Sequence, residues 1–200
     1  MFGKNVPTIE DLDTLVSRDS KRNNSVGKAV IYNMAMQYYP EIFDEEYVVC
    51  DIDGTIANLE HRLHFINNDD GTVKEVKDWK GFFANVEGDK PIESTIEILS
   101  DHIAKGRKII FVSARPESCR YQTEWWLWQH LEDKLGMEYV HLIMRGSDDR
   151  REDTDVKRDI HRKFLASLNV KCIIDDRPQV IRMWREEGYE VTDVGDGVDF

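Results

Sequence analysis

Short apolar runs alternate with amphipathic segments from residue 47 onward, and this alternation limits the possible folds more than any other feature of the sequence. The runs are rich in β-branched residues, which favour strands, whereas the segments between them have the apolar spacing of helices. The runs read YVVCD, KIIFVS, YVHLIM, VKCIID and YEVTDV. Strands that alternate with helices in this way predict an α/β fold, with a Rossmann-like parallel sheet and flanking helices.

Helices are predicted between and after these runs. The segment from Pro91 to Gly106 has apolar residues on one helical face, with Pro91 suited to the first turn and Gly106 placed to end the helix. Further helices are expected at about residues 117–135, 155–168 and 179–187.

The N-terminal part of the chain has a different character. It is polar around KRNNS and then helix-like in GKAVIYNMAMQYY. A chain of 200 residues with 40% hydrophobic content can bury the core of one medium-sized domain. We therefore interpret residues 46–200 as a single domain and residues 1–45 as a helical N-terminal appendage.

Several classes of protein are disfavoured by composition. No run approaches the roughly 18 apolar residues of a membrane span, and the first residues lack the apolar core of a signal peptide, so we expect no membrane partner and a cytoplasmic location. Cys50, Cys119 and Cys172 form no CxxC pair, and the two that flank apparent strands are expected to be buried thiols. The net charge of −12 opposes tight, sequence-independent binding to long nucleic acid, which normally relies on a basic face.

The first strand ends in DIDGT, which places two carboxylates where a parallel sheet opens its ligand crevice. Asp51 can attack phosphorus, and Asp53 can protonate the leaving oxygen and later deprotonate water. Crowding by Asp51 should raise the pKa of Asp53. Gly54 allows a sharp exit from the strand, and Thr55 can hydrogen-bond in the turn or with substrate. The alternative is a strand-terminal turn with capping acids.

One further strand and one helix start add candidate phosphate contacts. Ser113 ends the second strand and can donate a hydrogen bond to a phosphate oxygen, and Arg115 can supply a bidentate clamp. Lys157, near the start of the third helix, can neutralise charge on the phosphoryl group. Each has a plainer alternative, since a strand-terminal serine is usually a helix cap and a lysine in a charged segment usually faces solvent.

The fourth strand ends in a pair of acids, Asp175 and Asp176. Burial of two like charges is costly without a cation, and hard oxygen ligands suit Mg2+. Asp51, the backbone carbonyl of Asp53 and the acid pair therefore form the expected metal cage. An acidic helix cap is the alternative.

The ordered set of nucleophile, serine, lysine and acid pair resembles the four signatures of the haloacid dehalogenase superfamily over about residues 47 to 200. The sequence is most similar to the 3′-phosphatase domain of phage-type polynucleotide kinase/phosphatase, in DIDGTIANLEHR, DWKGFFANVEGDKPIE, FVSARPE, DTDVKRDI, IIDDRPQVIRMWREEG and the ending GVDF. The resemblance implies an Mg2+-dependent phosphatase with an aspartyl-phosphate intermediate. It implies these roles: Asp51 as nucleophile, Asp53 as acid/base, Ser113, Arg115 and Lys157 as phosphate contacts, Asp175 and Asp176 as metal acids.

Two more positions match this family. Arg62 stands where the family places an arginine that supports substrate binding. Asp153 stands where the family places an acid that orients the lysine or an arginine. Bifunctional members also carry a kinase domain with a GxxxxGK[ST] loop, which this sequence lacks. We therefore expect no 5′-kinase activity, and a separate kinase or ligase as a possible partner.

The insertion of residues 59–90 is expected to form a small cap over the site and to influence substrate choice. Its aromatic residues Trp79, Phe82 and Phe83 can stack on a base or pack as core, and packing is the commoner use of this spacing. The run Trp125, Trp126 and Trp128 has the same ambiguity, with packing or a partner surface favoured. His61 and His64, at a spacing of three, are a weak metal pair.

Three functions remain open on the sequence alone. The leading one is phosphate removal from the 3′ end of DNA or RNA, as in nucleic-acid repair. The runner-up is hydrolysis of free nucleoside monophosphates. A catalytically silent binding module is disfavoured, because a scaffold has no physical reason to keep so many acids converging on one site.

Overall fold

The computed structural model describes residues 45–68, 70–135 and 139–196. The expected appendage of residues 1–45 lies outside them except for Glu45, and the GVDF terminus lies outside them entirely.

A five-stranded parallel sheet is the centre of the domain, in the order β5-β4-β1-β6-β7. The strands are β1 (Glu46–Cys50), β4 (Lys108–Pro116), β5 (Tyr139–Arg145), β6 (Asn169–Asp175) and β7 (Val191–Asp193). They correspond to the predicted apolar runs, so the predicted α/β fold is confirmed.

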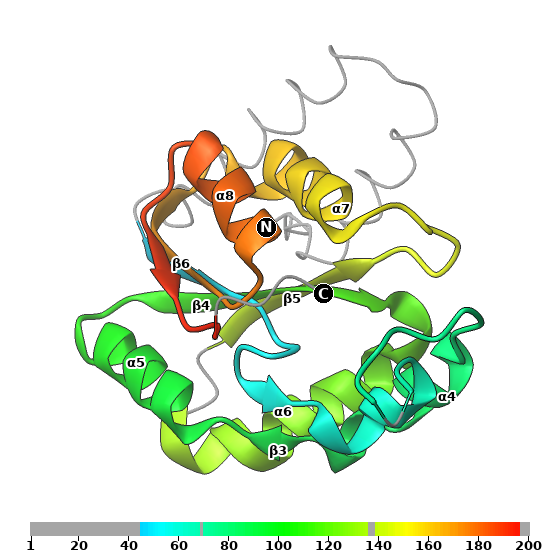
Figure 1. Cartoon of the computed structure of the whole chain (residues 1–200). Helices are drawn as coiled ribbons and strands as arrows, with labels where there is room; N and C mark the ends of the chain where they lie inside the picture. Colours follow the sequence, from blue (N-terminus) through cyan, green and yellow to red (C-terminus); the bar gives the residue numbers. More distant parts are fainter. Residues whose placement is uncertain (1–44, 69, 136–138, 197–200) are drawn as a thin grey trace, which may run out of the picture. The chain divides into compact units, whose positions relative to one another are not determined.

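Helices cover both faces of this sheet (Figure 1). They are α5 (Glu93–Ala104), α6 (Arg120–Leu135), α7 (Asp153–Ile160) and α8 (Pro178–Glu186). Helices α5 and α6 lie against one face of the sheet and α7 and α8 against the other, because each pair packs in a separate cluster of buried apolar residues. Two short turns extend this set: η4 (Glu117–Cys119) precedes α6, and the π-helical η5 (His161–Leu165) continues α7.

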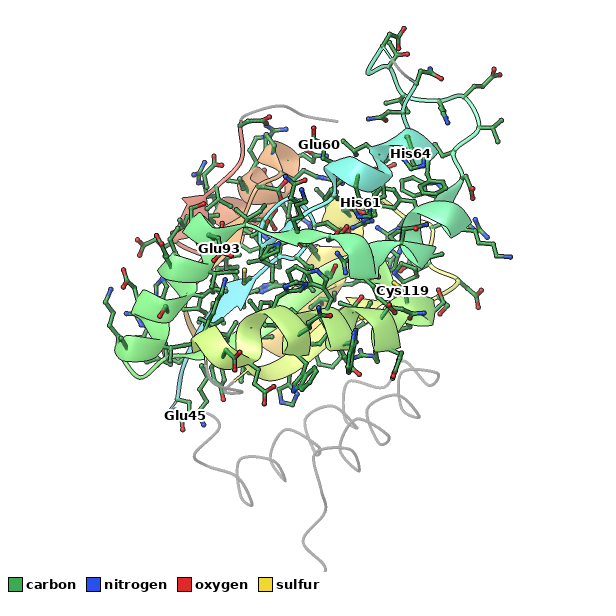
Figure 2. All side chains as sticks on the ribbon, turned by 90° about the horizontal axis from the view of Figure 1, so that it is seen from below. Glu45, Glu60, His61, His64, Glu93 and Cys119 are labelled. Atoms are coloured by element: carbon green, nitrogen blue, oxygen red, sulfur yellow. The ribbon has the colours of Figure 1, made fainter. Side chains whose placement is uncertain are left out.

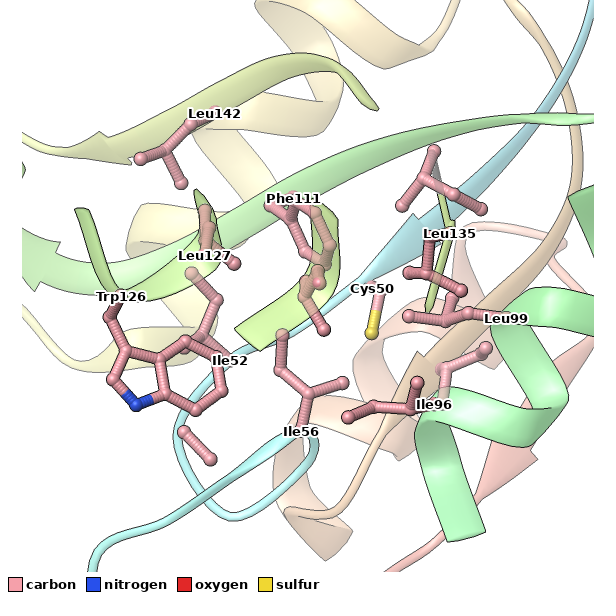
Figure 3. Packing of buried hydrophobic residues seen from close by; sticks show 14 of the residues in the cluster. Cys50, Ile52, Ile56, Ile96, Leu99, Phe111, Trp126, Leu127, Leu135 and Leu142 are labelled. Carbon is pink, nitrogen blue, oxygen red and sulfur yellow. The ribbon is translucent and has the colours of Figure 1, made fainter. Parts of the chain in front are cut away.

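Alternation along β1 explains the two cores. Val48 and Cys50 point toward α5 and α6, whereas Tyr47 and Val49 point toward α7 and α8. A strand buried on both faces has no polar side, which is why its sequence is a continuous apolar run. Figure 3 shows the first of these cores, where Trp126 and other residues of α6 pack against the strands.

One predicted helix start was wrong. Pro91 does not begin a helix: it lies in β3 (Lys90–Pro91), which pairs with β2 (Ala57–Asn58) in a two-stranded antiparallel sheet, and α5 starts only after Ile92. A proline suits this position because proline has no backbone N–H, and an edge strand does not need that donor on its open side. The third helix begins earlier than expected, at Asp153. Gly106, with φ of 80°, follows the end of α5 as predicted.

The insertion between β1 and β4 is a small layer of short elements closed by the β2–β3 pair. It contains η2 (Glu60–Phe65), α4 (Trp79–Ala84) and η3 (Val86–Gly88). It has its own apolar cluster of Leu59, Ile66 and Phe82. No helix in the described part of the chain is long and apolar enough to cross a bilayer.

Candidate functional site

The site lies at the carboxyl edge of the central strands. The chain leaves β1 toward β4 on one side and later returns to β6 on the other, so this edge is the point where the strand order reverses. The backbone N–H of Asp51 donates to the carbonyl of Ile174 at 3.0 Å, which fixes the end of β1 beside β6. Gly54 follows in a turn with φ of 80°.

Three carboxylates meet there. Ligand atoms of Asp51, Asp175 and Asp176 all lie within 4.8 Å of one another, and within the described ranges this is the one such group of potential metal ligands. Lys157 bridges two of them, with Nζ 2.9 Å from Oδ1 of Asp51 and 2.8 Å from Oδ2 of Asp175. Its side chain is buried.

The carboxylates are short of positive charge despite this lysine. Burial, together with the charges of Asp175 and Asp176, raises the pKa of Asp51 well above its usual value, although Lys157 opposes the shift. Burial and Asp175 raise the pKa of Asp176 to about 6. These carboxylates cannot all stay ionised without further positive charge. Such a set of oxygen donors is suited to a divalent cation such as Mg2+. The residues present therefore fit the expected metal.

Asp53 lies in a different environment from the one predicted. Its Oδ1 accepts from Nη2 of Arg62 at 2.5 Å and from Nε and Nη2 of Arg115 at 2.9 and 2.6 Å. Burial opposes ionisation, but the charges of Arg115 and Arg62 outweigh it and lower the pKa of Asp53 to about 2. The expected rise was wrong because two arginines, rather than Asp51, are its nearest charges.

A buried carboxylate that the sequence did not single out completes this cluster. Asp89 accepts from Nε of Arg62 at 2.7 Å and from Nη2 of Arg115 at 2.6 Å. Nε1 of Trp126 donates to the Asp89 carbonyl at 2.8 Å, which ties the end of the insertion to α6. Asp89 precedes β3 in an ordinary polar turn, so no spacing pattern marks it in the sequence.

Ser113 and Thr55 make protein contacts in the structure. The Ser113 hydroxyl accepts from the backbone N–H of Arg115 at 3.2 Å, and Thr55 donates to Oδ1 of Asp176 at 2.8 Å. Both side chains are buried at the edge of the site. Thr55 therefore orients one of the acids proposed to bind metal.

Asp153, one helical turn before Lys157 on α7, pairs with two arginines. It forms ion pairs with Arg145 of β5 and with Arg177, which precedes α8. The Arg145 guanidinium also donates to the carbonyl of Arg151 at 3.0 Å. Neither Arg145 nor Arg177 was a sequence candidate, because isolated arginines after strands are common on surfaces.

A cavity of about 720 Å3 opens above these groups. Asp51, Asp53 and Lys157 line it, whereas Arg62 and Arg115 are buried behind Asp53. One wall comes from the insertion and the other from the β5–α7 loop and the start of α8. The residues that line these walls include Trp79, Lys77 and Lys80 on the first, and Arg145, Arg151 and Arg177 on the second.

The remaining candidates separate into packing and surface. His61 and His64 both lie on η2 (Figure 2), where His61 contacts Asp89 at 3.0 Å and His64 contacts the backbone of His61, so the pair does not converge on one point. All three cysteines are free and buried, and burial was expected for the two that flank strands. Among the aromatics, Phe82 and Trp126 are core residues and Trp79, Trp125 and Trp128 are exposed.

Comparison with known proteins gives one family. The family described as "Polynucleotide kinase PNKP phosphatase domain" matches residues 45–200. The "Putative bifunctional polynucleotide kinase/RNA ligase" of Autographa californica nuclear polyhedrosis virus is 27% identical over 153 residues, which are 75% of this chain and 20% of the viral protein.

Solved structures agree in fold. A chain of the Pnkp1/Rnl/Hen1 complex is 25% identical to this chain, with a TM-score of 0.60. The match covers 78% of this chain and 47% of the chain in that complex. The class C acid phosphatase from Bacillus anthracis with tungstate bound has a TM-score of 0.51 at 13% identity. The match covers 93% of this chain and 85% of the phosphatase chain. This chain thus spans only a part of the first two relatives.

Proposed function

The chain belongs to the family of polynucleotide kinase PNKP phosphatase domains, which are phosphoric monoester hydrolases of the haloacid dehalogenase superfamily, and on that premise we propose that it removes the 3′-phosphate from a DNA or RNA end. The observation that carries the proposal is the meeting of Asp51, Lys157 and the Asp175–Asp176 pair beside one cavity, which Asp51 and Lys157 line.

In the proposed reaction Asp51 is the nucleophile. One of its carboxylate oxygens forms a bond to phosphorus while the bond from phosphorus to the 3′ oxygen breaks, which leaves an aspartyl-phosphate. Lys157 lies 2.9 Å from Oδ1 of Asp51 and would neutralise charge on the phosphoryl oxygens. Water then attacks phosphorus, the bond to Asp51 breaks, and inorganic phosphate leaves.

Asp53 is the proposed acid and base. The hydrogen bonds that its side chain accepts from other described residues all end on Oδ1, so Oδ2 is the oxygen that would give a proton to the leaving 3′ oxygen and take one from water. Arg62 and Arg115 favour the ionised form, so the proposal requires that the negative charge of the bound phosphate raise the pKa of Asp53 and protonate Oδ2 before the 3′ oxygen leaves. Arg62 and Arg115 hold this carboxylate in place, and we propose that they act by positioning Asp53 rather than by clamping phosphate. Ser113 fixes the end of β4 by accepting a hydrogen bond from the backbone N–H of Arg115.

The proposed cofactor is Mg2+, with Asp51, Asp175, Asp176 and the Asp53 backbone carbonyl as its ligands. Bound there, it would supply Lewis-acid stabilisation of charge on the phosphoryl group. Thr55 orients Asp176 for this role. Asp153 would orient Arg145 and Arg177 at the wall of the cavity.

The proposal extends to the setting of the reaction. Residues 59–90 would act as the cap, since they supply one wall of the cavity. A separate kinase or ligase is the proposed partner class, because the product is a free hydroxyl that such enzymes can use. The unpaired buried thiols support a reducing, cytoplasmic setting.

Phosphate release with Mg2+ tests the function. The substrates, at equal concentration, are oligonucleotides with a 3′-phosphate or a 5′-phosphate and the 3′- and 5′-mononucleotides. We expect the 3′-phosphorylated oligonucleotide to be hydrolysed fastest. Preference for mononucleotides would assign the protein to nucleotide metabolism instead, and no release from any substrate would refute the phosphatase proposal.

A further inference from the structure

The wall that the insertion contributes to the cavity has an unusual charge for this protein. The chain carries a net charge of −12, yet among the described residues this wall contributes Lys77 and Lys80 and no acidic side chain to the cavity lining. Lys80 makes no ion pair within the described ranges, so its charge is available to an anion. A cationic wall beside a phosphate-processing centre is suited to a ligand with more than one phosphate.

Between these two lysines lies an exposed aromatic ring. Trp79 is 44% exposed and lines the cavity. It packs at 17° to the plane of Phe83 with centroids 5.8 Å apart, and edge-on to Phe82 at 5.7 Å. Two aromatic neighbours thus fix the indole, so a second planar group can stack on it at little cost in side-chain entropy.

One of the two cations contacts the aromatic ring. Nζ of Lys77 lies over the Trp79 ring, 5.2 Å from its centre. A base that stacks on this face would displace the flexible lysine toward the ring edge, where its ammonium group can pair with a backbone phosphate of the same strand. A duplex offers no free base face inside the chain, whereas a single strand does.

We propose that Trp79, Lys77 and Lys80 form a subsite for the nucleotides that precede the terminal phosphate of a single strand, with a base stacked on Trp79 and backbone phosphates beside the lysines. This inference rests on the proposed function and adds to it the part of the substrate that is recognised. It distinguishes an oligonucleotide from a mononucleotide by contacts away from the reacting phosphate.

The test compares Trp79→Leu with Trp79→Phe and with Trp125→Leu. Trp125 is a matched control because it is also 44% exposed but does not line the cavity. Binding is measured by fluorescence anisotropy of a labelled trinucleotide that bears a 3′-hydroxyl, in deoxyribose and ribose forms, so that the readout does not depend on turnover. Phosphate release is measured with the same trinucleotides bearing a 3′-phosphate and with a fully abasic deoxyribose version.

We expect Trp79→Leu to weaken trinucleotide binding about tenfold, Trp79→Phe to retain most of it, and Trp125→Leu to bind as the wild type does. The same loss should appear in kcat/KM for the trinucleotide and be absent for the abasic version. The double variant Lys77→Ala, Lys80→Ala should weaken binding of both the intact and the abasic trinucleotide, and should make binding less dependent on salt concentration. The control variant Lys105→Ala should change neither the binding nor its salt dependence.

Equal binding by Trp79→Leu and Trp125→Leu would overturn the subsite, and so would equal losses on the intact and abasic strands. These outcomes are separate from failure of the proposed function. If the wild type released phosphate from no substrate, the function would fall, while a loss of trinucleotide binding specific to Trp79 would still establish the subsite.

Discussion

Nζ of Lys157 lies 2.9 Å from Oδ1 of Asp51, and both side chains are buried. The lysine thus holds one oxygen of the proposed nucleophile and also pairs with Asp175 at 2.8 Å, so one cation serves two acids. Since Asp176 lies beside the same pair, the three carboxylates in their ionised forms are balanced only when a further cation is present.

Asp51→Asn should lower phosphate release by at least about a thousandfold, because the amide keeps the volume of the side chain but cannot attack phosphorus. The thermal midpoint should not fall, since the variant removes a like charge from a crowded cluster. Phosphate-release assays measure the turnover, and thermal melts measure the midpoint. Asp133→Asn, an exposed acid, serves as the control, and near wild-type turnover in Asp51→Asn would mean that another residue attacks.

Gly54→Ala should abolish turnover and destabilise the fold. Gly54 has φ of 80°, and a Cβ at this position would collide with Oδ2 of Asp176. Gly71 has φ of 83°, and a Cβ there would meet no atom within 4 Å, so Gly71→Ala reports the backbone strain alone, about 1 kcal/mol. Thermal melts and phosphate release of the two variants should differ sharply, and similar behaviour would show that Asp176 moves freely.

Asp89→Ala should lower the free energy of unfolding by about 3–5 kcal/mol, because it leaves Arg62 and Arg115 buried with fewer negative partners. Glu93→Ala removes an exposed ion pair with Lys134 and should cost less than about 1 kcal/mol. Urea titrations measure both. A small loss in Asp89→Ala would mean that the two arginines find other partners.

Without metal, stability should depend on pH through Asp176. Its pKa is raised from 3.8 to about 6, so the folded state binds the proton more tightly than the unfolded state. The resulting stabilisation is fully present below pH 3.8 and is lost as the pH rises through about 6. In EDTA, the thermal midpoint should therefore fall between about pH 5 and 7 more in the wild type than in Asp176→Asn.

Mg2+ should reverse this loss, since a bound cation favours the ionised acids. The midpoint at about pH 7 should rise with Mg2+ in the wild type and stay constant in Asp176→Asn. Potassium chloride at equal ionic strength controls for screening. A rise of the same size in both would place the ion away from this acid.

The sequence predicted the parts of the molecule that rest on periodicity. The five strands alternate with helices that have one apolar face each, so strand identity and the parallel arrangement could be inferred from the spacing of apolar residues alone. The candidate residues converge at the same edge of the sheet, because Asp51 follows β1, Asp175 and Asp176 end and follow β6, and Lys157 lies in the second turn of α7.

The environment of Asp53 could not be predicted in this way. Its pKa depends on Arg62 and Arg115, which reach it from the insertion and from β4, and on the side-chain directions of both. Asp89 has no local signal because its partners are distant in sequence. Spacing along the chain indicates which residues share an edge, but not which charges touch.

The central place of β1 has a consequence for the order in which the protein is made. Cys50, the residue before Asp51, is paired with Phe111 of β4 on one side and with Ile174 of β6 on the other. A chain that emerges from the ribosome must therefore hold the strand of the proposed nucleophile half-paired until β6 has been translated. Nascent chains that stop before β6 lack both of the acids proposed to bind metal and one neighbour of β1, so we expect hydrolysis to begin only after β6 has been made.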